Sequence, residues 1–430
     1  MASTRTIKVD YLARVEGEGA LYVKVEGDRV ADVKLNIFEP PRFFEAFLQG
    51  RGFQEVPDIT ARICGICPVA YQMSAVHALE NALGITVSPE VRALRRLMYC
   101  AEWIESHALH IYLLHAPDFL GYESSITLAA DHPVEVKRGL RLKKIGNELL
   151  ALLGGRSVHP VSACVGGFYR APRRRDLLAL RDDLAWALEA AHATVHWVSG
   201  FDFPDFTTDC EFVALRHPGE YPLNEGRVVS SKGLDIAIEE YDQYFIEEHV
   251  AHSNALQSHR IGGGSFFVGP LARVNLNFGR LSLQAQAAAR ASGIAFPNSN
   301  AFTAIVARAI ELVHVCEEAL QLLDKYVEPS PSRVEVVPRA GTGCAATEAP
   351  RGLLYHRYEV DQQGLIRTAR IVPPTSQNLR RIEDDLRAFV PTVLDLPEED
   401  ATWRCEQLVR NYDPCISCAT HFLKLRIERD

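Results

Sequence analysis

The chain has 430 residues, of which 47% are hydrophobic and 23% are charged, and its formal net charge is -9. This length and composition allow a large buried core, in one big domain or two, as in a soluble enzyme or enzyme subunit. The acidic balance gives no reason to expect nucleic acid or an anionic membrane as a partner, and no apolar run is long enough for a membrane span.

The predicted elements run from a β-rich start through a long helical body to a mixed C-terminal part. Alternating apolar residues at 20–25 and 30–38, around a turn at 27–29, predict a β-hairpin. Apolar residues at three-and-four spacing then predict helices, at 69–83, 91–115, 134–153, 176–199, 281–291 and 304–326. A second hairpin is expected over 354–373. The expected fold class is therefore mainly α with small β parts (α+β).

Two Cys-x-x-Cys pairs, Cys64/Cys67 and Cys415/Cys418, lie at opposite ends of the chain. Four thiolates make a soft, anionic pocket that suits transition metals rather than magnesium or calcium. A structural zinc site usually takes its cysteines from one compact segment, whereas these pairs can meet only when the whole chain has folded. The spacing favours a metal inside a large domain, and a structural zinc site is the alternative.

Both pairs belong to longer sequence blocks that follow one another along the chain. The first pair lies in Arg-Ile-Cys-Gly-Ile-Cys at 62–67, and the second lies in Asp-Pro-Cys-Ile-Ser-Cys-Ala-Thr-His at 413–421. The other blocks are 14–17, 44–51, 155–160, 268–273 and 348–352. Together, over nearly the full length, they resemble the large subunit of nickel–iron hydrogenases.

The resemblance implies one domain over residues 1–430 with long central helices and β-hairpins near both ends. Within it we expect a β-rich start at about 1–40, a helical body at about 41–340 and a mixed part at about 341–421. Relatives are typically cut after the histidine of the last motif, so residues 422–430 are expected to be a cleaved tail.

The resemblance further implies that the four cysteines bind nickel, and that Cys67 and Cys418 also bridge to an iron atom carrying carbon monoxide and cyanide. Cys64 and Cys415 would be terminal ligands, and Cys415 would be the first proton acceptor. Splitting dihydrogen, a very weak acid, needs a redox-active metal beside a base, and zinc has no redox activity. Glu16 matches the proton-relay carboxylate of the family. Without its block, Glu16 would be interpreted as a surface carboxylate at a hairpin edge.

Further residues are implied around the metals. Arg351, with Pro350 beside it, matches an arginine that stabilises cyanide or polarises dihydrogen, although a structural salt bridge is the alternative. Asp413 is expected either to pair with Arg351 or to shape the turn before Pro414. Thr375 is a candidate for a hydrogen bond to a cyanide.

Glu45 and His421 match two ligands of a second cation, usually magnesium. The third ligand would be a backbone carbonyl, which we assign to Leu386. His107 and His159 are interpreted either as hydrogen-bond donors to cysteine sulfur or as satisfied core histidines.

Two departures from the family pattern suggest a branch. Tyr71 stands where many relatives carry a histidine, and Ser106 stands where many carry an acidic residue. With the ending at 413–418, they look most like cytoplasmic bidirectional hydrogenases linked to NAD(P).

The predicted partners follow from what the sequence lacks. It has no G-x-G-x-x-G motif, since Gly262, Gly263 and Gly264 do not have that spacing, and no ferredoxin-like cysteine run. Electrons are therefore expected to leave through a small subunit with iron–sulfur clusters, and then through a flavin subunit that meets NAD(P). A maturation endopeptidase and nickel-insertion factors are implied partners.

The N-terminus has no apolar signal core, and the ten cysteines are typical of a reduced, cytoplasmic protein. Three alternatives remain open: a deazaflavin-linked or sulfur-reducing hydrogenase subunit, a non-catalytic relative of a respiratory complex I subunit, and a zinc-stabilised scaffold.

Overall fold

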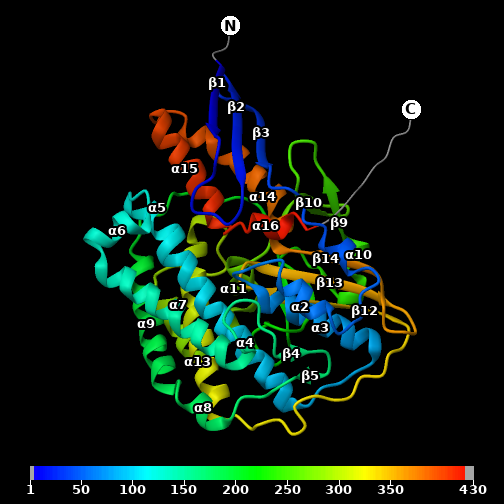
Figure 1. Ribbon diagram of the computed structural model, residues 1–430. Coiled ribbons are helices and arrows are strands. Elements are labelled where there is room, and N and C mark those ends of the chain that lie inside the picture. The colour runs from blue at the N-terminus through cyan, green and yellow to red at the C-terminus, as the bar shows by residue number, and fades with distance from the viewer. Residues whose placement is uncertain (1–3, 422–430) are drawn as a thin grey trace, which may run out of the picture.

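Four long helices form the body of the computed structural model, which describes residues 4–421 (Figure 1). They are α4 (Pro89–Ala108), α7 (Pro133–Gly154), α9 (Arg181–Ser199) and α13 (Ala304–Asp324), and they pack against one another as a bundle. Each buries an apolar stripe at three-and-four spacing, as Leu97, Ala101 and Ile104 do on α4. Helical structure is confirmed in the six ranges predicted from this spacing, although two of the predicted helices are divided.

The structure divides two of the predicted helices. The helix expected over 91–115 is α4 followed by a π-helical segment, Leu109–His115, and then by α5 (Ala116–Leu120). The π-helical segment ends two residues before Pro117, which has no N–H to continue the helical hydrogen bonds. The helix expected over 176–199 is divided into α8 (Arg174–Leu178) and α9.

The N-terminal sheet has three antiparallel strands, β1 (Thr4–Val9), β2 (Gly19–Glu26) and β3 (Arg29–Ile37), in that order. Side chains of β2 alternate between buried and partly exposed positions, as expected for a sheet with one covered face. The covering helices are α14 (Pro374–Phe389) and α15 (Glu398–Asn411). The predicted hairpin is β2–β3, and β1 was not predicted.

A second three-stranded sheet, β12 (Gly341–Ala349), β13 (Gly352–Val360) and β14 (Ile366–Val372), packs on α3 (Pro68–Leu83). A Cβ on Gly343 would lie 2.2 Å from the carbonyl oxygen of Ala78 on α3, so this close packing requires glycine. The turn between β12 and β13 contains Pro350 and Arg351. The sheet therefore places these two residues at its end, beside the segment that carries the second cysteine pair.

Smaller elements complete the described chain. A four-stranded sheet has the order β11-β6-β7-β8, and β9 pairs with β10 as β4 pairs with β5. The strands are β4 (Ala163–Cys164), β5 (Gly167–Phe168), β6 (Glu211–Arg216), β7 (Arg227–Ser230), β8 (Asp235–Ile236), β9 (Phe245–His249), β10 (Leu256–Arg260) and β11 (Phe266–Phe267). The helices are α1 (Phe44–Leu48), α2 (Val56–Ala61), α6 (Ser125–Asp131), α10 (Tyr241–Tyr244), α11 (Pro270–Asn277), α12 (Leu283–Ala291) and α16 (Ile416–Ala419).

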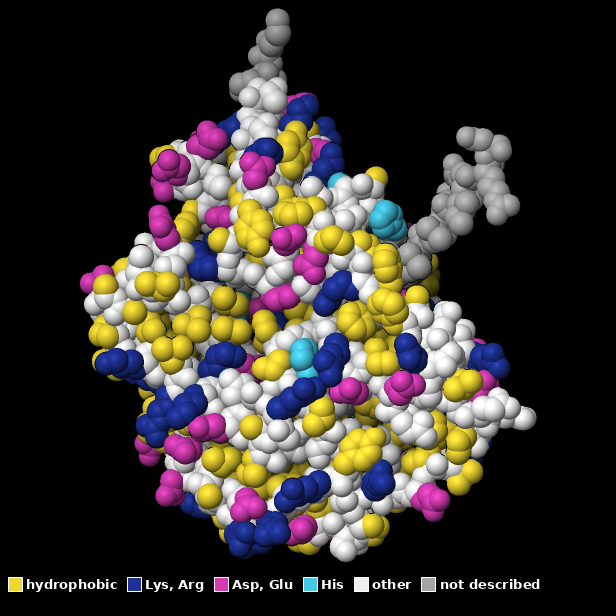
Figure 2. Space-filling view, in the orientation of Figure 1, with side chains coloured by type: hydrophobic (Ala, Val, Ile, Leu, Met, Phe, Trp, Pro, Cys, Tyr) yellow, Lys and Arg dark blue, Asp and Glu magenta, His cyan; other side chains and the backbone are white. Residues whose placement is uncertain are grey.

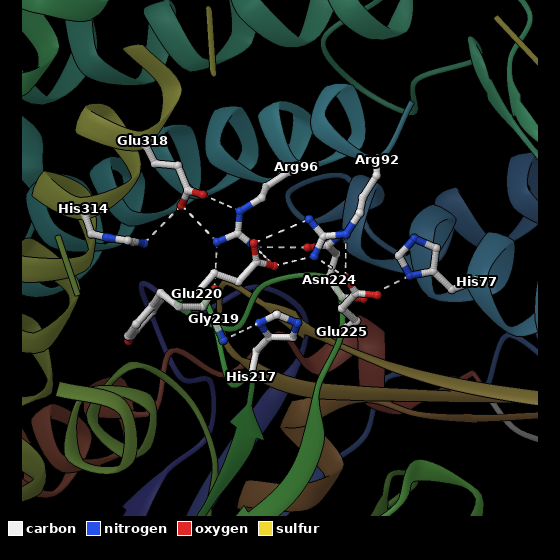
Figure 3. A network of polar contacts seen from close by, with 11 residues as sticks. His77, Arg92, Arg96, His217, Gly219, Glu220, Asn224, Glu225, His314 and Glu318 are labelled. Carbon is white, nitrogen blue, oxygen red and sulfur yellow. Dashed lines mark hydrogen bonds and ion pairs between the residues drawn. The ribbon is translucent and has the colours of Figure 1, made fainter. Parts of the chain in front are cut away.

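Two arginines of α4 tie the bundle to the loop before β7 through ion pairs (Figure 3). Arg92 binds both Glu220 and Glu225, and Arg96 binds Glu220 and, on α13, Glu318. Between residues 4 and 421, none of the helices combines the length and apolar character that a membrane crossing requires. The predicted tail at 422–430 lies outside the described residues.

Candidate metal centre

The structure brings the two cysteine pairs together. Cys64 and Cys67 lie on the segment between α2 and α3, while Cys415 directly precedes α16 and Cys418 lies within it. The Sγ atom of Cys415 lies 3.6 Å from that of Cys64 and 2.7 Å from that of Cys418. The sulfurs of Cys64, Cys67 and Cys418 all lie within 4.8 Å of one another. All four thiols are buried, so segments from the two ends of the chain form one enclosed sulfur pocket (Figure 1 shows α16 near the centre of the molecule).

The spacing of these sulfurs fits a bound transition metal. Metal–sulfur bonds of about 2.3 Å place tetrahedral sulfurs about 3.8 Å apart. The sulfurs of Cys64 and Cys415 are close to this separation at 3.6 Å, whereas those of Cys415 and Cys418 lie closer together at 2.7 Å. Backbone N–H groups of Ile66 and Cys67 donate to the sulfur of Cys64 at 3.3 and 3.2 Å. Burial opposes ionisation of Cys64, but hydrogen bonds from neighbouring thiols and the charge of Arg351 lower its pKa well below the usual value. The pocket therefore contains a thiolate that is ready to bind a soft cation.

Glu16 lies directly beside the second cysteine pair. Its backbone carbonyl accepts a hydrogen bond from the N–H of Ile416 at 2.8 Å, which pairs the N-terminal loop with the start of α16. Its Oε2 accepts from the Sγ of Cys415 at 3.0 Å and from the N–H of Ser417 at 3.1 Å. Glu16 is thus a partly buried carboxylate in contact with a thiol, and not a free surface group at a hairpin edge.

The loop that carries Glu16 is held by a buried carboxylate. Arg14, in the left-handed region at φ 59, binds Asp118 and the carbonyl of Leu114. Arg410 pairs with the same Asp118 and also donates to the carbonyl of Ala13 at 2.9 Å. Asp118 therefore anchors the loop and the end of α15 together.

Arg351 reaches the other side of the sulfur pocket. Its Nε donates to the carbonyl of Asp413 at 2.9 Å, and its Nη2 lies 3.2 Å from Oδ1 of the same residue. Burial lowers the pKa of Arg351, but the charges of Asp413 and Cys415 outweigh burial and raise it well above the usual value. Its Nη1 is buried and has no hydrogen-bond partner within residues 4–421. An unpaired cationic donor of this kind is available to an anionic ligand or a water.

Two more predicted residues lie next to this pocket. Pro350 precedes Arg351 in the turn between β12 and β13. Thr375, at the start of α14, accepts a hydrogen bond from the N–H of Cys415 at 3.1 Å. The hydroxyl of Thr375 therefore fixes the backbone of a cysteine that is itself in the pocket.

Glu45 and His421 meet at a separate, mostly buried site. His421 Nε2 lies 3.7 Å from Oε1 of Glu45 and 2.6 Å from the carbonyl oxygen of Ile371. The carbonyl that contacts His421 is that of Ile371, and not that of Leu386, which was assigned as the third ligand. Ile371 lies near the end of β14. A backbone carbonyl can belong to any residue type, so the sequence gives no signal for it.

A second carboxylate near this site was missed by the sequence analysis. Burial raises the pKa of Glu247 to about 7, while the charges of His421 and Arg370 partly oppose that rise. The negative charge of Glu45 raises it further. Two carboxylates, an imidazole and a carbonyl suit a hard divalent cation. No motif surrounds Glu247 in the sequence, so nothing pointed to it.

Another group of metal-ligating side chains does not form a comparable site. His217, Glu220 and Glu225 have ligand atoms within 4.8 Å of one another. Figure 3 shows that the guanidinium of Arg92 already binds both carboxylates. The positive charge of Arg92 therefore already neutralises these carboxylates, and the sulfur pocket is the better candidate for a metal site.

Three residues that the sequence analysis discussed have distinct surroundings. The buried hydroxyl of Tyr71 has no hydrogen-bond partner among the described residues, and burial, with the charges of Cys418 and Cys67, raises its pKa well above the usual value. His107 contacts Glu311 at 3.0 Å, and His159 contacts the carbonyl of Ala61 at 2.8 Å. Within residues 4–421 neither histidine bonds a cysteine sulfur, and the buried Nδ1 of His107 has no hydrogen-bond partner there.

Comparison with known proteins agrees with this geometry. The nickel-dependent hydrogenase family matches residues 42–138 and 240–421. The chain is 35% identical to sulfhydrogenase 1 subunit alpha of Pyrococcus furiosus, over 97% of this chain and 98% of that protein. It is 29% identical to the NAD-reducing hydrogenase HoxS subunit beta of Cupriavidus necator, over 98% and 95% respectively.

Among solved structures, the chain resembles an NAD+-reducing [NiFe]-hydrogenase in the H2-reduced state, with a TM-score of 0.86 and 28% identity. The match covers 98% of this chain and 100% of that chain. The predicted family and fold class are therefore confirmed. The chain belongs to the nickel-dependent hydrogenase family, as the catalytic large subunit of a nickel–iron hydrogenase.

Proposed function

We propose that this subunit oxidises dihydrogen reversibly at a nickel–iron centre bound by Cys64, Cys67, Cys415 and Cys418, and that the electrons reach NAD(P). The observation that carries the proposal is the convergence of four buried sulfurs, from opposite ends of the chain, with a carboxylate on one of them. Similarity to an NAD+-reducing enzyme over the full chain supports the acceptor.

The residues around the pocket fit such a centre. Cys67 and Cys418 would bridge nickel and iron, and Cys64 and Cys415 would bind nickel alone. When bound, the centre supplies the redox-active metals at which dihydrogen is split. The unpaired Nη1 of Arg351 would donate to an anionic ligand of the iron, which we propose to be cyanide beside carbon monoxide.

The proton route proposed here uses two side chains. The Sγ of Cys415 holds the proton first, because this sulfur is in contact with the carboxylate of Glu16. The proton then passes across the 3.0 Å contact to Oε2 of Glu16. Glu16 is partly exposed, so a proton on its carboxylate has a way out to solvent.

Electrons must leave by another face, and we propose that an iron–sulfur small subunit docks over the first cysteine pair. Gly65, between Cys64 and Cys67, is exposed, and a Cβ added to it would have no non-neighbouring atom within 4 Å. Nearby, the 155–160 loop, tied to α2 by His159, exposes Val158 at 45%. On the face drawn in Figure 2, hydrophobic side chains are interspersed with charged ones. Flavin and NAD(P) would then be bound by further subunits.

We propose magnesium, or another divalent cation, at Glu45, His421 and the carbonyl of Ile371. A cation there would neutralise the Glu45 and Glu247 carboxylates and fix the C-terminal end of the described chain next to β14. Since His421 is buried at this site, we further propose that a maturation endopeptidase cuts after it once nickel-insertion factors have loaded the centre. We also propose that the protein is cytoplasmic and that residues 1–430 belong to one domain.

One experiment tests the main proposal. The complex is purified without oxygen, its nickel and iron are quantified, and infrared spectra are recorded in the region where metal-bound carbon monoxide and cyanide absorb. Nickel, iron and these bands, with hydrogen-dependent reduction of NAD(P)+, are the expected result. Zinc alone, without bands, would refute it.

Sulfur reduction is a second candidate, because the chain is 35% identical to a sulfhydrogenase subunit. In this case hydrogen oxidation by the same preparation would drive release of sulfide from polysulfide. Comparing the rates with NAD(P)+ and with polysulfide distinguishes the two acceptors.

A further inference from the structure

Arg273, on α11, has a completely buried guanidinium whose donors are all used. Its Nε and Nη2 bind the two carboxylate oxygens of Glu311 at 2.7 and 2.8 Å. Its Nη1 binds Oε2 of Glu348 at 3.0 Å and the carbonyl of Ala349 at 2.9 Å, and its Nη2 binds the carbonyl of Pro350 at 2.9 Å. These five bonds match the five N–H groups of an arginine.

The groups that receive these bonds are themselves held in place. Tyr221 donates to Glu311 at 2.7 Å, and His107 lies 3.0 Å from its other oxygen. Burial would raise the pKa of Glu311, but the charge of Arg273 outweighs burial and lowers it to about 2. The indole ring of Trp103 lies 4.1 Å from the guanidinium carbon of Arg273. Arg273 is therefore a rigid, charged connection between α13, α4 and the end of β12.

The two carbonyls that Arg273 binds directly precede Arg351. On the other side of the turn, a Cβ on Gly269 would lie 2.8 Å from the carbonyl oxygen of Arg351. Gly269 adopts φ 124, which a residue with a side chain rarely adopts. The backbone on both sides of Arg351 is thus fixed by the segment 269–273, while its side chain extends to Asp413 and the sulfur pocket.

We propose that Arg273 is a positioning residue for the hydrogenase reaction. It holds the turn from which Arg351 extends, so that the unpaired Nη1 of Arg351 faces the ligands of the iron. Lysine cannot do this, because a single ammonium group cannot bind one carboxylate with two nitrogens and two carbonyls as well. The inference rests on the proposed placement of Arg351 beside the metal centre.

The test uses the complete, metal-loaded complex and three single variants. In Arg273→Lys we expect wild-type nickel and iron content, infrared bands of metal-bound carbon monoxide and cyanide shifted in the same direction as in Arg351→Lys, and turnover about 10- to 100-fold lower. Arg95→Lys is the matched control. Arg95 is equally buried and binds Glu80 with two nitrogens at 2.8 and 2.7 Å, together with a carbonyl at 3.3 Å. Because Arg95 does not contact the 348–351 turn, its variant should leave the bands unchanged.

A double variant decides whether Arg273 acts through Arg351. If it does, Arg273→Lys adds little to the loss already caused by Arg351→Lys, because coupled residues are not additive. Independent, multiplying losses would overturn the inference, as would unshifted bands in Arg273→Lys. If Arg351→Lys itself leaves the bands unshifted, the placement of Arg351 is wrong and this inference falls with it.

Trp103→Phe covers the case in which Arg273→Lys does not fold. Trp103 donates from Nε1 to the carbonyl of Glu348 at 3.2 Å. Phenylalanine keeps an aromatic ring beside Arg273, removes this bond and leaves a small cavity where the indole was. We expect a smaller band shift in the same direction, and no shift would overturn the inference.

Discussion

The contact between Glu16 and Cys415 leads to a quantitative prediction. Glutamine at position 16 has nearly the same size, and its amide oxygen can still accept from the N–H of Ser417, which lies 3.1 Å from the carboxylate now. An amide cannot take up a proton from the Sγ of Cys415, which lies 3.0 Å away. The Glu16→Gln variant should therefore keep its fold and its metals but lose proton transfer. Loss of a general acid–base group lowers rates by about 10²- to 10⁴-fold, or about 3 to 5 kcal/mol in the barrier.

The assay is isotope exchange between dihydrogen and deuterated water, which needs proton transfer at the centre but no electron acceptor. Glu18→Gln is a matched control, because Glu18 has the same chemistry two residues along but is exposed. It should exchange at the wild-type rate. Metal content and infrared bands equal to the wild type would show that the centre is intact in Glu16→Gln. If that intact variant exchanged at the normal rate, the proposed relay would be refuted.

Three other predictions concern the metals and the buried carboxylates. Cys67→Ser should lose both nickel and iron, and therefore all turnover, as measured by metal analysis, because this sulfur is proposed to bridge them. Glu45→Gln should weaken retention of the divalent cation by about 10- to 100-fold, and chelator titration followed by thermal unfolding would detect this. Glu105 is raised to a pKa of about 7, chiefly by burial, against the opposing charge of Lys143. Folding therefore takes up a proton at this carboxylate, so stability should fall by at most about 3 kcal/mol as pH rises from about 4.5 through 7. Denaturant midpoints from pH 5 to 8 should show a smaller slope for Glu105→Gln.

The helical body was predictable because its apolar residues recur at the helical period. Other elements lack such a signal. The strand β12 is rich in glycine and alanine and does not alternate, because α3 packs so closely on it that larger side chains do not fit. The helix α14 is different: its apolar residues Leu379, Ile382, Leu386 and Phe389 do recur at helical spacing, but it was missed. Polar residues such as Gln377, Asn378 and Asp385 are buried alongside them. Their hydrogen bonds to other segments arise only from the tertiary structure.

The candidate site was predictable where a side chain belongs to a sequence block. The four cysteines, Glu16 and Arg351 were identified in this way, and the structure brings them together. A backbone carbonyl gives no such signal, which is why Leu386 was assigned in place of Ile371. The block at 268–273 was recognised, but its role was not, because the five bonds of Arg273 depend on residues that are distant in the sequence.

The geometry also explains why the last part of the chain must be in place for the centre to form. Four buried thiols in contact cannot all ionise without a cation, because several negative charges at low dielectric repel strongly. Two of them, Cys415 and Cys418, belong to a segment held by Glu16 and, through Arg410, by Asp118. Metal binding neutralises the charges and holds both ends of the chain at once, so the folding of this segment and the loading of the centre are coupled. Loss of metal should therefore expose the C-terminal segment first, and limited proteolysis of the metal-free protein should cleave next to α16 before it cleaves the helical bundle.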